Sequence, residues 1–425
     1  MNALKGKHLL ILGGDTLSAD IIRAAKKEGV LTTVIDWYSV ENSPSKLLAD
    51  QHFEISIKDY DAIDKLIENQ KIDGVITGFT DSYLEPYAEI CRRNNLPSYA
   101  SKELFEKTLD KKIFKEYCRK YGIPIVPEYD IDAILKVGKL PASKILIKPV
   151  DSSGSRGIVL VTNFSDLTSS LEESLSFSAK KEVVVERYMD IDDVSMCYTI
   201  QNGEISLSAI CDRYIHKTEK FGSVTSGLIY PSQYLGRYVE EVDSKVRIML
   251  KEMGIMNGVL FLQAFVDKDS FYFYEMGYRL SGGRHYIFTE EENGVSAASA
   301  LVRFALTGEM GIKDLENLDR PDFKNVFSQI SVLCKSQTIT KIKGLEEIKL
   351  LPGVLDVSLR YNEGDTVGKE GTTMQIVARI HLKAIDIHAM QELISTIQSL
   401  LIIEGENDEN IIEDFFQIPI DVYER

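Results

Sequence analysis

The first 100 residues repeat one pattern, in which a short apolar run ends at glycine or a polar residue and a helical pattern often follows. The apolar runs and helical patterns are, in chain order, residues 9–12, 18–27, 30–35, 73–76 and 83–93. Strands that alternate with helices form a parallel, doubly wound sheet, which binds ligands at the carboxyl ends of its strands. We therefore expect such a sheet in residues 1–100, with Gly13, Gly14, Asp36, Thr77 and Asp81 at its binding edge.

The composition excludes several classes of protein. The glycines after the first strand lack GxGxxG spacing, which disfavours a nicotinamide enzyme. A net charge of −16 argues against a nucleic-acid or anionic-membrane partner. No apolar run approaches the roughly 20 residues of a membrane helix, and the first run is too short for a signal peptide, so a cytoplasmic location is expected by default. The five cysteines have no CxxC spacing and are expected to be buried or incidental thiols.

After residue 100 the predicted secondary structure no longer alternates regularly between strand and helix. Strand signals dominate residues 145–306, interrupted by helical patterns at 167–177 and 238–253, which is typical of an α+β region. From about residue 322 the pattern is mixed again, with an alternating strand at 374–382 and a helical stripe at 387–401. The fold class is therefore a multidomain combination of α/β and α+β units.

A strand at residues 145–148 delivers Lys148 to a loop of small residues. That loop contains Ser152, Ser153, Gly154, Ser155 and Gly157, with Arg156 beside them. Small residues allow successive backbone N–H groups to point into one concavity, which favours anion binding. A simple hairpin loop is the alternative. Upstream, Lys111 and Lys112 occupy the first turn of a helical pattern, where the macrodipole disfavours cations, which hints at a function. Two solvated lysines are the simpler explanation of this segment alone.

Polar residues also follow the apolar run at 183–185. Glu186, Arg187 and Tyr188 come directly after it, and the acidic residues 190, 192 and 193 follow. A strand that leaves a core at a linker between two lobes can present backbone groups to a purine edge, and a later carboxylate can take ribose hydroxyls. Taken alone, the segment is better explained as an exposed acidic turn.

Two strands at residues 258–266 and 271–276, joined by the turn 267–270, carry Gln263 and Glu275 among apolar and aromatic residues. An unpaired carboxylate in such surroundings is unfavourable. Oxygen ligands on neighbouring strands suit Mg²⁺, which completes its shell with phosphates and water. A structural pair is the alternative. Just beyond, Arg279 and Arg284 flank a glycine-containing loop and are suited to bind a carboxylate or phosphate; His285 is expected at the surface.

Taken in order, these segments resemble the ATP-grasp superfamily, particularly the branch of biotin carboxylase, carbamoyl-phosphate synthase and the L-amino-acid ligases. The resemblance implies a Rossmann-like preATP-grasp domain at 1–100, a two-lobed ATP-grasp domain at 101–310 and a C-terminal α+β lobe at 311–425. It also implies ATP and Mg²⁺, with Mn²⁺ as an alternative ion. Small-molecule acid and amine substrates and a homodimer are the partners expected.

The resemblance assigns roles to the matching residues. Lys111 and Lys148 resemble the two ATP lysines, and Ser152 to Gly157 the loop that closes over the phosphates. Glu186 to Tyr188 would contact adenine, Asp193 the ribose, and Gln263 and Glu275 the metal. The catalytic residues would be Lys148, Arg279 and Arg284, with Arg279 at the reacting carboxylate or the transferring phosphate.

One position departs from the family pattern. The family usually has Glu-x-Asn-x-Arg, whereas Gly277 stands where the asparagine belongs and offers no side-chain ligand. The expected activity is an ATP-dependent carboxylate–amine ligase that forms an acyl phosphate from an amino acid or similar small acid. The alternatives are an enzyme like phosphoribosylglycinamide synthetase or carbamoyl-phosphate synthase, and an ATP-grasp protein that binds nucleotide without ligase activity.

Overall fold

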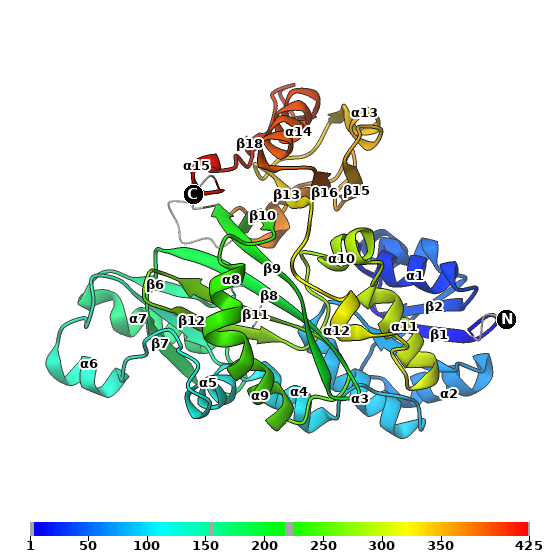
Figure 1. The fold of residues 1–425 in the computed structure, drawn as a ribbon, viewed down its shortest axis with the longest axis horizontal. Coiled ribbons are helices and arrows are strands. Elements are labelled where there is room, and N and C mark those ends of the chain that lie inside the picture. Colours follow the sequence, from blue (N-terminus) through cyan, green and yellow to red (C-terminus); the bar gives the residue numbers. More distant parts are fainter. Residues whose placement is uncertain (1–3, 153–155, 217–223, 424–425) are drawn as a thin grey trace.

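The computed structural model describes residues 4–152, 156–216 and 224–423 of the chain. These residues form a four-stranded parallel sheet, a small three-stranded sheet, a nine-stranded sheet and a two-stranded ribbon. Figure 1 shows the parallel sheet on one side, the small sheet on the other, and the large sheet between them with its end below the C-terminal elements. The α/β plus α+β fold class is confirmed.

The N-terminal sheet is parallel with strand order β3-β2-β1-β4, and its pairing confirms the doubly wound pattern. Its elements are β1 (His8–Leu12), α1 (Ser18–Lys27), β2 (Leu31–Asp36), β3 (Gln51–Glu54), α2 (Tyr60–Gln70), β4 (Gly74–Thr77) and α3 (Leu84–Arg93). Sequence patterning missed β3, because it is a largely exposed edge strand without an apolar run. A helix from far along the chain, α11 (Ala297–Thr307), packs on β4 and α1. It lies so close that a Cβ at Gly74 would be 2.1 Å from the Ala305 carbonyl oxygen.

A helical segment then leads to the small sheet, which has the order β6-β5-β7. The elements are α4 (Lys102–Leu109), α5 (Lys111–Lys120), α6 (Ile131–Val137), β5 (Ile145–Pro149), β6 (Val159–Val161), α7 (Leu167–Ser176) and β7 (Val183–Arg187). Ile145, Ile147, Leu167 and Val185 give this sheet and α7 their own apolar core, separate from the rest of the molecule. The small sheet is therefore a distinct lobe.

The large sheet is antiparallel and runs β12-β11-β8-β9-β10-β13-β16-β15, with β18 paired to β13. Its first strands are β8 (Asp192–Gln201), β9 (Glu204–His216), β10 (Val224–Tyr230), β11 (Gly258–Val266) and β12 (Phe271–Gly277), with α8 (Leu235–Tyr238) and α9 (Ser244–Glu252) between β10 and β11. Sequence patterning missed β10, in which Ser226 and Gly227 interrupt the apolar run. Because β10 pairs with β13, the C-terminal strands extend the same sheet.

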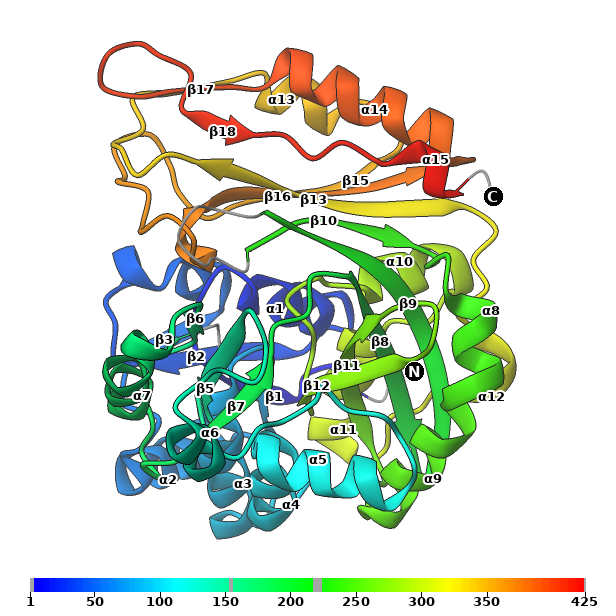
Figure 2. The same cartoon turned by 90° about the vertical axis from the view of Figure 1, so that its left-hand side faces the viewer.

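The C-terminal elements cover one end of this sheet, as Figure 2 shows. The elements that follow β12, apart from α11 described above, are α10 (Tyr286–Asn293), α12 (Leu315–Leu318), β13 (Val326–Cys334), β14 (Lys341–Lys343), α13 (Leu345–Lys349), β15 (Val354–Leu359), β16 (Ile376–Ala384), α14 (Ile387–Leu400), β17 (Ile402–Glu404), β18 (Ile412–Asp414) and α15 (Ile420–Tyr423); β13, β15, β16 and β18 belong to the sheet itself. One face of β13 and β16 packs apolar residues against α14. None of the helices in the described ranges combines the length and apolar composition needed to cross a bilayer. All five cysteines are buried and free, as expected.

Candidate functional site

Lys148 and Glu186 meet inside the small lobe. The Lys148 Nζ atom lies 2.6 Å from Glu186 Oε2, because β5 and β7 are neighbouring strands. A second lysine, Lys115 on α5, is fully buried and bonds the same carboxylate, and its Nζ lies 2.9 Å from Glu128 Oε1. Burial alone would raise the pKa of Glu186, but the ammonium groups of Lys148 and Lys115 lower it to about 2. The glutamate is therefore ionised and holds two cations at the base of the lobe.

Lys111 lies beside the loop that follows Lys148. Its Nζ donates to the carbonyl of Ser152 at 2.5 Å, and its backbone N–H donates to the carbonyl of Val150 at 3.4 Å. The two lysines predicted from the sequence thus flank the start of the same loop. Gly157, at its end, has φ of 75°. Ser153, Gly154 and Ser155 lie outside the described residues.

Asp193 faces the small lobe from the large sheet. Its carboxylate accepts a hydrogen bond from Arg213 at 2.7 Å and from the Tyr274 hydroxyl at 3.0 Å. Burial raises the pKa of Asp193, and Arg213 opposes this shift. The Tyr274 ring also lies 5.5 Å from Lys148 Nζ, so it connects Asp193 to the lysine of the other lobe. The predicted nucleotide residues of the two lobes therefore meet at Tyr274.

Gln263 and Glu275 are directly paired across β11 and β12. Residues opposite each other in an antiparallel pair project to the same side of the sheet. Asp193 lies on this side too, since it pairs with Phe265, two residues beyond Gln263. No group of three His, Cys, Asp or Glu side chains suited to a metal occurs in the described ranges. One carboxylate and one amide oxygen nevertheless suit Mg²⁺ in a site where phosphates supply further ligands.

Gly277 is packed against an aromatic ring. It pairs with Phe261, and a Cβ at Gly277 would lie 2.3 Å from two atoms of that ring. The same ring lies 5.1 Å from the guanidinium of Arg279. Phe261 thus fills the space that an asparagine side chain would need, and it packs against the arginine instead. Any side chain at position 277 would therefore have to displace the Phe261 ring.

Arg279 bridges the large sheet to the N-terminal sheet. Its Nε and Nη2 atoms donate to the two carboxylate oxygens of Asp81, at 2.5 and 2.8 Å. Asp81 follows β4, so this pair joins the edge at which a doubly wound sheet binds ligands. Close by in the chain, the buried Thr77 hydroxyl has no hydrogen-bond partner among the described residues. Asp36, at the end of β2, is instead occupied by Gly14 N–H at 2.8 Å and by the buried Lys46 at 2.8 Å.

Arg284 is surrounded by carboxylates. It is 2% exposed, and its guanidinium donates to both oxygens of Asp20 on α1, at 2.6 and 2.9 Å, and to Asp356 on β15 at 2.6 Å. The structure thus places it as a tie between the first helix and the C-terminal strands. His285 was expected at the surface, and that expectation is wrong. The side chain is 1% exposed, and burial lowers its pKa to about 4, so it is neutral at neutral pH.

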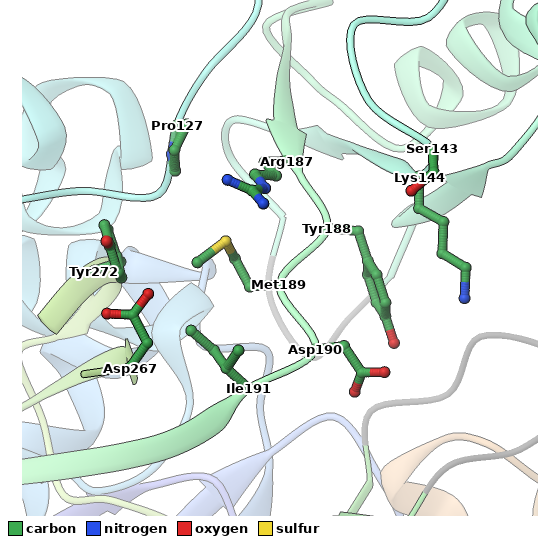
Figure 3. A pocket seen from close by; sticks show the side chains of 10 residues that line it. All are labelled: Pro127, Ser143, Lys144, Arg187, Tyr188, Met189, Asp190, Ile191, Asp267 and Tyr272. Atoms are coloured by element: carbon green, nitrogen blue, oxygen red, sulfur yellow. The ribbon is translucent and has the colours of Figure 1, made fainter. Parts of the chain in front are cut away.

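A pocket of about 420 Å³ opens beside the segment that joins β7 to β8. Figure 3 shows Tyr188 and Lys144 on one side of it and Asp267 and Tyr272 on the other. Arg187 also lines it, and its backbone N–H donates to the carbonyl of Pro127 at 2.9 Å. The segment between the lobes, which the sequence suggested for adenine, therefore borders a cavity.

Sequence reasoning missed two cations of the site. Lys115 lies one helical turn after Lys111, which was the available signal. Arg213 lies three residues before the end of β9 at His216. The negative partners of both residues come from distant segments, so no local pattern shows them.

Residues 108–283 match the family model of the ATP-grasp domain. The chain therefore contains an ATP-grasp domain, and it is this domain that holds Lys111, Lys148, Glu186, Gln263 and Glu275. Among curated proteins, the carbamoyl phosphate synthase large chain of Saccharolobus islandicus is 24% identical over 185 residues, which cover 41% of this chain and 18% of the relative. The match thus spans less than a fifth of that protein.

Solved structures share the fold over nearly the whole chain. The L-amino acid ligase of Bacillus licheniformis has a TM-score of 0.77 at 18% identity, covering 95% of this chain and 100% of that one. The biotin carboxylase domain of Hydrogenobacter thermophilus 2-oxoglutarate carboxylase, in complex with MgADP, ADP and bicarbonate, has a TM-score of 0.74 at 19% identity, covering 94% and 91%. At these identities the likeness concerns the fold.

Proposed function

We propose that this protein is an ATP-dependent carboxylate–amine ligase that works through an acyl phosphate. The observation that carries the proposal is the meeting of the two lobes at Tyr274, which contacts Lys148 and Asp193 next to Glu275. A nucleotide between the lobes would have cations, a ribose acceptor and a metal-binding pair along its length. The similar biotin carboxylase domain, which was solved with MgADP, supports this placement.

ATP would lie with its base at the pocket beside Tyr188 and its phosphates toward Lys111 and Lys148. Backbone groups of residues 186–188 would meet the adenine edge, and Asp193 the ribose. In the ATP complex, phosphate oxygens would compete with Glu186 for Lys148, while Lys115 keeps the glutamate paired. Gln263 and Glu275 would hold Mg²⁺, which would screen charge on the phosphates.

In the first step a carboxylate oxygen of the acid attacks the γ-phosphorus. The bond from that phosphorus to the β,γ-bridging oxygen breaks, and ADP leaves. An amine then attacks the acyl carbon, loses a proton and expels phosphate, which leaves an amide. Arg279 would orient the reacting carboxylate, because it reaches both the metal-binding strand and the edge of the N-terminal sheet. Lys148 would stabilise the charge of the transferring phosphoryl group.

An ADP-release screen over amino acids and other small acids, each paired with amines, tests the proposal. Lys148→Ala serves as the blank and Lys112→Ala as the matched control, since the Lys112 side chain is 61% exposed. We expect turnover with at least one acid–amine pair, lost in Lys148→Ala and kept in Lys112→Ala. Full activity in Lys148→Ala would overturn the proposal. A cytoplasmic location and a homodimer stay predictions.

A nucleotide-binding protein without ligase activity is the second candidate. Gly277 favours it, because the family asparagine is absent and Phe261 fills its place. In that case MgATP would bind and raise the thermal midpoint, yet no acid–amine pair would release ADP. The same screen therefore separates the two candidates.

A further inference from the structure

The C-terminal part of the large sheet has one apolar face and one polar face. Ile330, Val332, Ala378, Ile380 and Leu382 belong to the apolar core beneath α14. Alternate residues of the same strands point the other way. On that side the register aligns Gln329, His381 and Asp356 in one row and Ser331, Arg379 and Ser358 in the next. Gln329, Ser331 and His381 are buried, so this polar face is covered by other parts of the molecule rather than open to solvent.

Arg379 stands out on the polar face. It is partly buried, and in the described ranges no salt bridge or hydrogen bond joins its guanidinium to another residue. Burial and the guanidinium groups of Arg360 and Arg284 lower its pKa to about 10, with a smaller opposing effect of Asp15. The residue is charged at neutral pH. Because no carboxylate of the described residues neutralises it, this guanidinium can bind an anion.

The neighbouring cations are already paired or bonded, and the neighbouring histidines are neutral. Arg284 is bonded to Asp20 and Asp356. Burial lowers the pKa of His381 well below its usual range, and His285 behaves in the same way. Both nitrogens of the buried His285 ring lack a hydrogen-bond partner among the described residues. Among the cations of this face, Arg379 therefore supplies positive charge that no carboxylate of the described residues neutralises.

The loop of residues 279–285 connects this face to the proposed reaction centre. It begins at Arg279, beside the metal-binding strand, and reaches the polar face at Arg284, whose Nη1 lies 3.2 Å from the Ser358 hydroxyl. Ser358 pairs with Arg379 in the sheet. Between the two arginines, a Cβ at Gly282 would meet no atom within 4 Å, so there is open space beside the loop. The loop thus links Arg279, at the metal-binding strand, to Arg284, which contacts the strand beside Arg379.

We propose that Arg379 binds a substrate carboxylate that the reaction does not consume. The substrate is then an α-amino acid that serves as the amine, or a dicarboxylic acid of which one end reacts near Arg279. This inference rests on the proposed function for the identity of the reacting end. It adds a second, non-reacting anionic group to the substrate and a residue of the C-terminal strands that recognises it.

The test compares the binding of carboxylates and their amides by calorimetry in the presence of MgADP. L-Glutamate is compared with L-glutamine, and glycine with glycinamide, so that the first pair probes a dicarboxylic acid and the second an amino acid used as amine. The proteins are wild type, Arg379→Met and Arg379→Lys. Lys383→Met is the matched control, because it removes a cation from the same face of the same strand, where Lys383 bonds Glu291 at 2.9 Å.

We expect wild type and Lys383→Met to bind at least one carboxylate ten times more tightly than its amide. The ratio should fall to near one in Arg379→Met and lie between these values in Arg379→Lys. If wild type shows no preference in either pair, or Arg379→Met keeps it, the inference is overturned. MgADP binding reports folding of each variant, and if the methionine variant fails this check, Arg379→Gln takes its place. This test measures binding and not turnover. A failure of the ligase proposal would appear as absent ADP release in the screen, and it is therefore distinguishable from a failure of this inference.

Discussion

The two ends of the proposed site treat their cations differently. At the nucleotide end, Lys148 and Lys115 share the single carboxylate of Glu186, so one lysine can turn to a phosphate while the other keeps the glutamate neutralised. At the substrate end, Arg284 is held by Asp20 and Asp356, which belong to elements on either side of it. The difference shows how to decide whether a cation near a site can bind a ligand. It can do so if its carboxylate partner still has a second cation after the first one has moved. By that criterion Lys148 is available to a ligand and Arg284 is part of the scaffold.

The largest expected effect concerns Arg284. Arg284→Met leaves Asp20 and Asp356 without their cation, and breaking a buried pair in this way costs about 3–5 kcal/mol. We expect a marked fall of the thermal midpoint. Arg320→Met is the control, since the pair of Arg320 with Asp322 is more than half exposed and contributes about 0–1 kcal/mol. Equal thermal midpoints for the two variants would mean that the bonds of Arg284 to Asp20 and Asp356 do not stabilise the fold. Arg284 and Lys148 would then not differ in the way proposed above.

The next effect tests the nucleotide end through its metal-binding pair. Glu275→Gln keeps the shape of the side chain and removes the only carboxylate of the pair. We expect ADP release to fall about 100-fold or more, in line with the loss of one electrostatic contact to the transition state. Asp269→Asn, at the exposed tip of the same hairpin, is the control and should keep full activity. If Glu275→Gln had the wild-type rate and the same dependence on Mg²⁺ concentration, the metal would not bind at these strands.

The shared carboxylate also predicts a dependence of stability on pH. The pKa of Glu186 in the folded protein, about 2, lies below its ordinary value of 4.5. Its contribution to stability is therefore fully present above pH 4.5 and is lost as the pH falls from 4.5 toward 2, by about 3 kcal/mol. Thermal midpoints between pH 7 and pH 3 should fall less steeply in Glu186→Gln than in wild type. Parallel profiles would indicate that the two lysines do not share an ionised glutamate.

The sequence pattern was most informative where a polar residue interrupts an otherwise apolar strand. Lys148, Gln263 and Glu275 are polar residues in apolar strands, and such positions are conspicuous without a structure. The parallel sheet followed from the alternation of strands and helices. The edge strand β3 was missed because exposed strands need no apolar run. The ties of Arg284 and the burial of His285 could not be predicted, because their surroundings are assembled from segments separated by up to hundreds of residues.

The smallest effect lies between the two ends, at Gly277. Gly277→Asn places a side chain against the Phe261 ring, which has to move or be strained, and overpacking of this kind costs about 1–3 kcal/mol. In the double variant Phe261→Leu with Gly277→Asn, the smaller side chain makes room, so the two changes should be less destabilising together than the sum of each alone. Thermal midpoints of the four proteins in this cycle measure the coupling. Additive midpoints would show that Phe261 does not occupy the place of the family asparagine. A coupled cycle would show that the Phe261 ring, which also contacts the guanidinium of Arg279, occupies the space that an asparagine at position 277 needs.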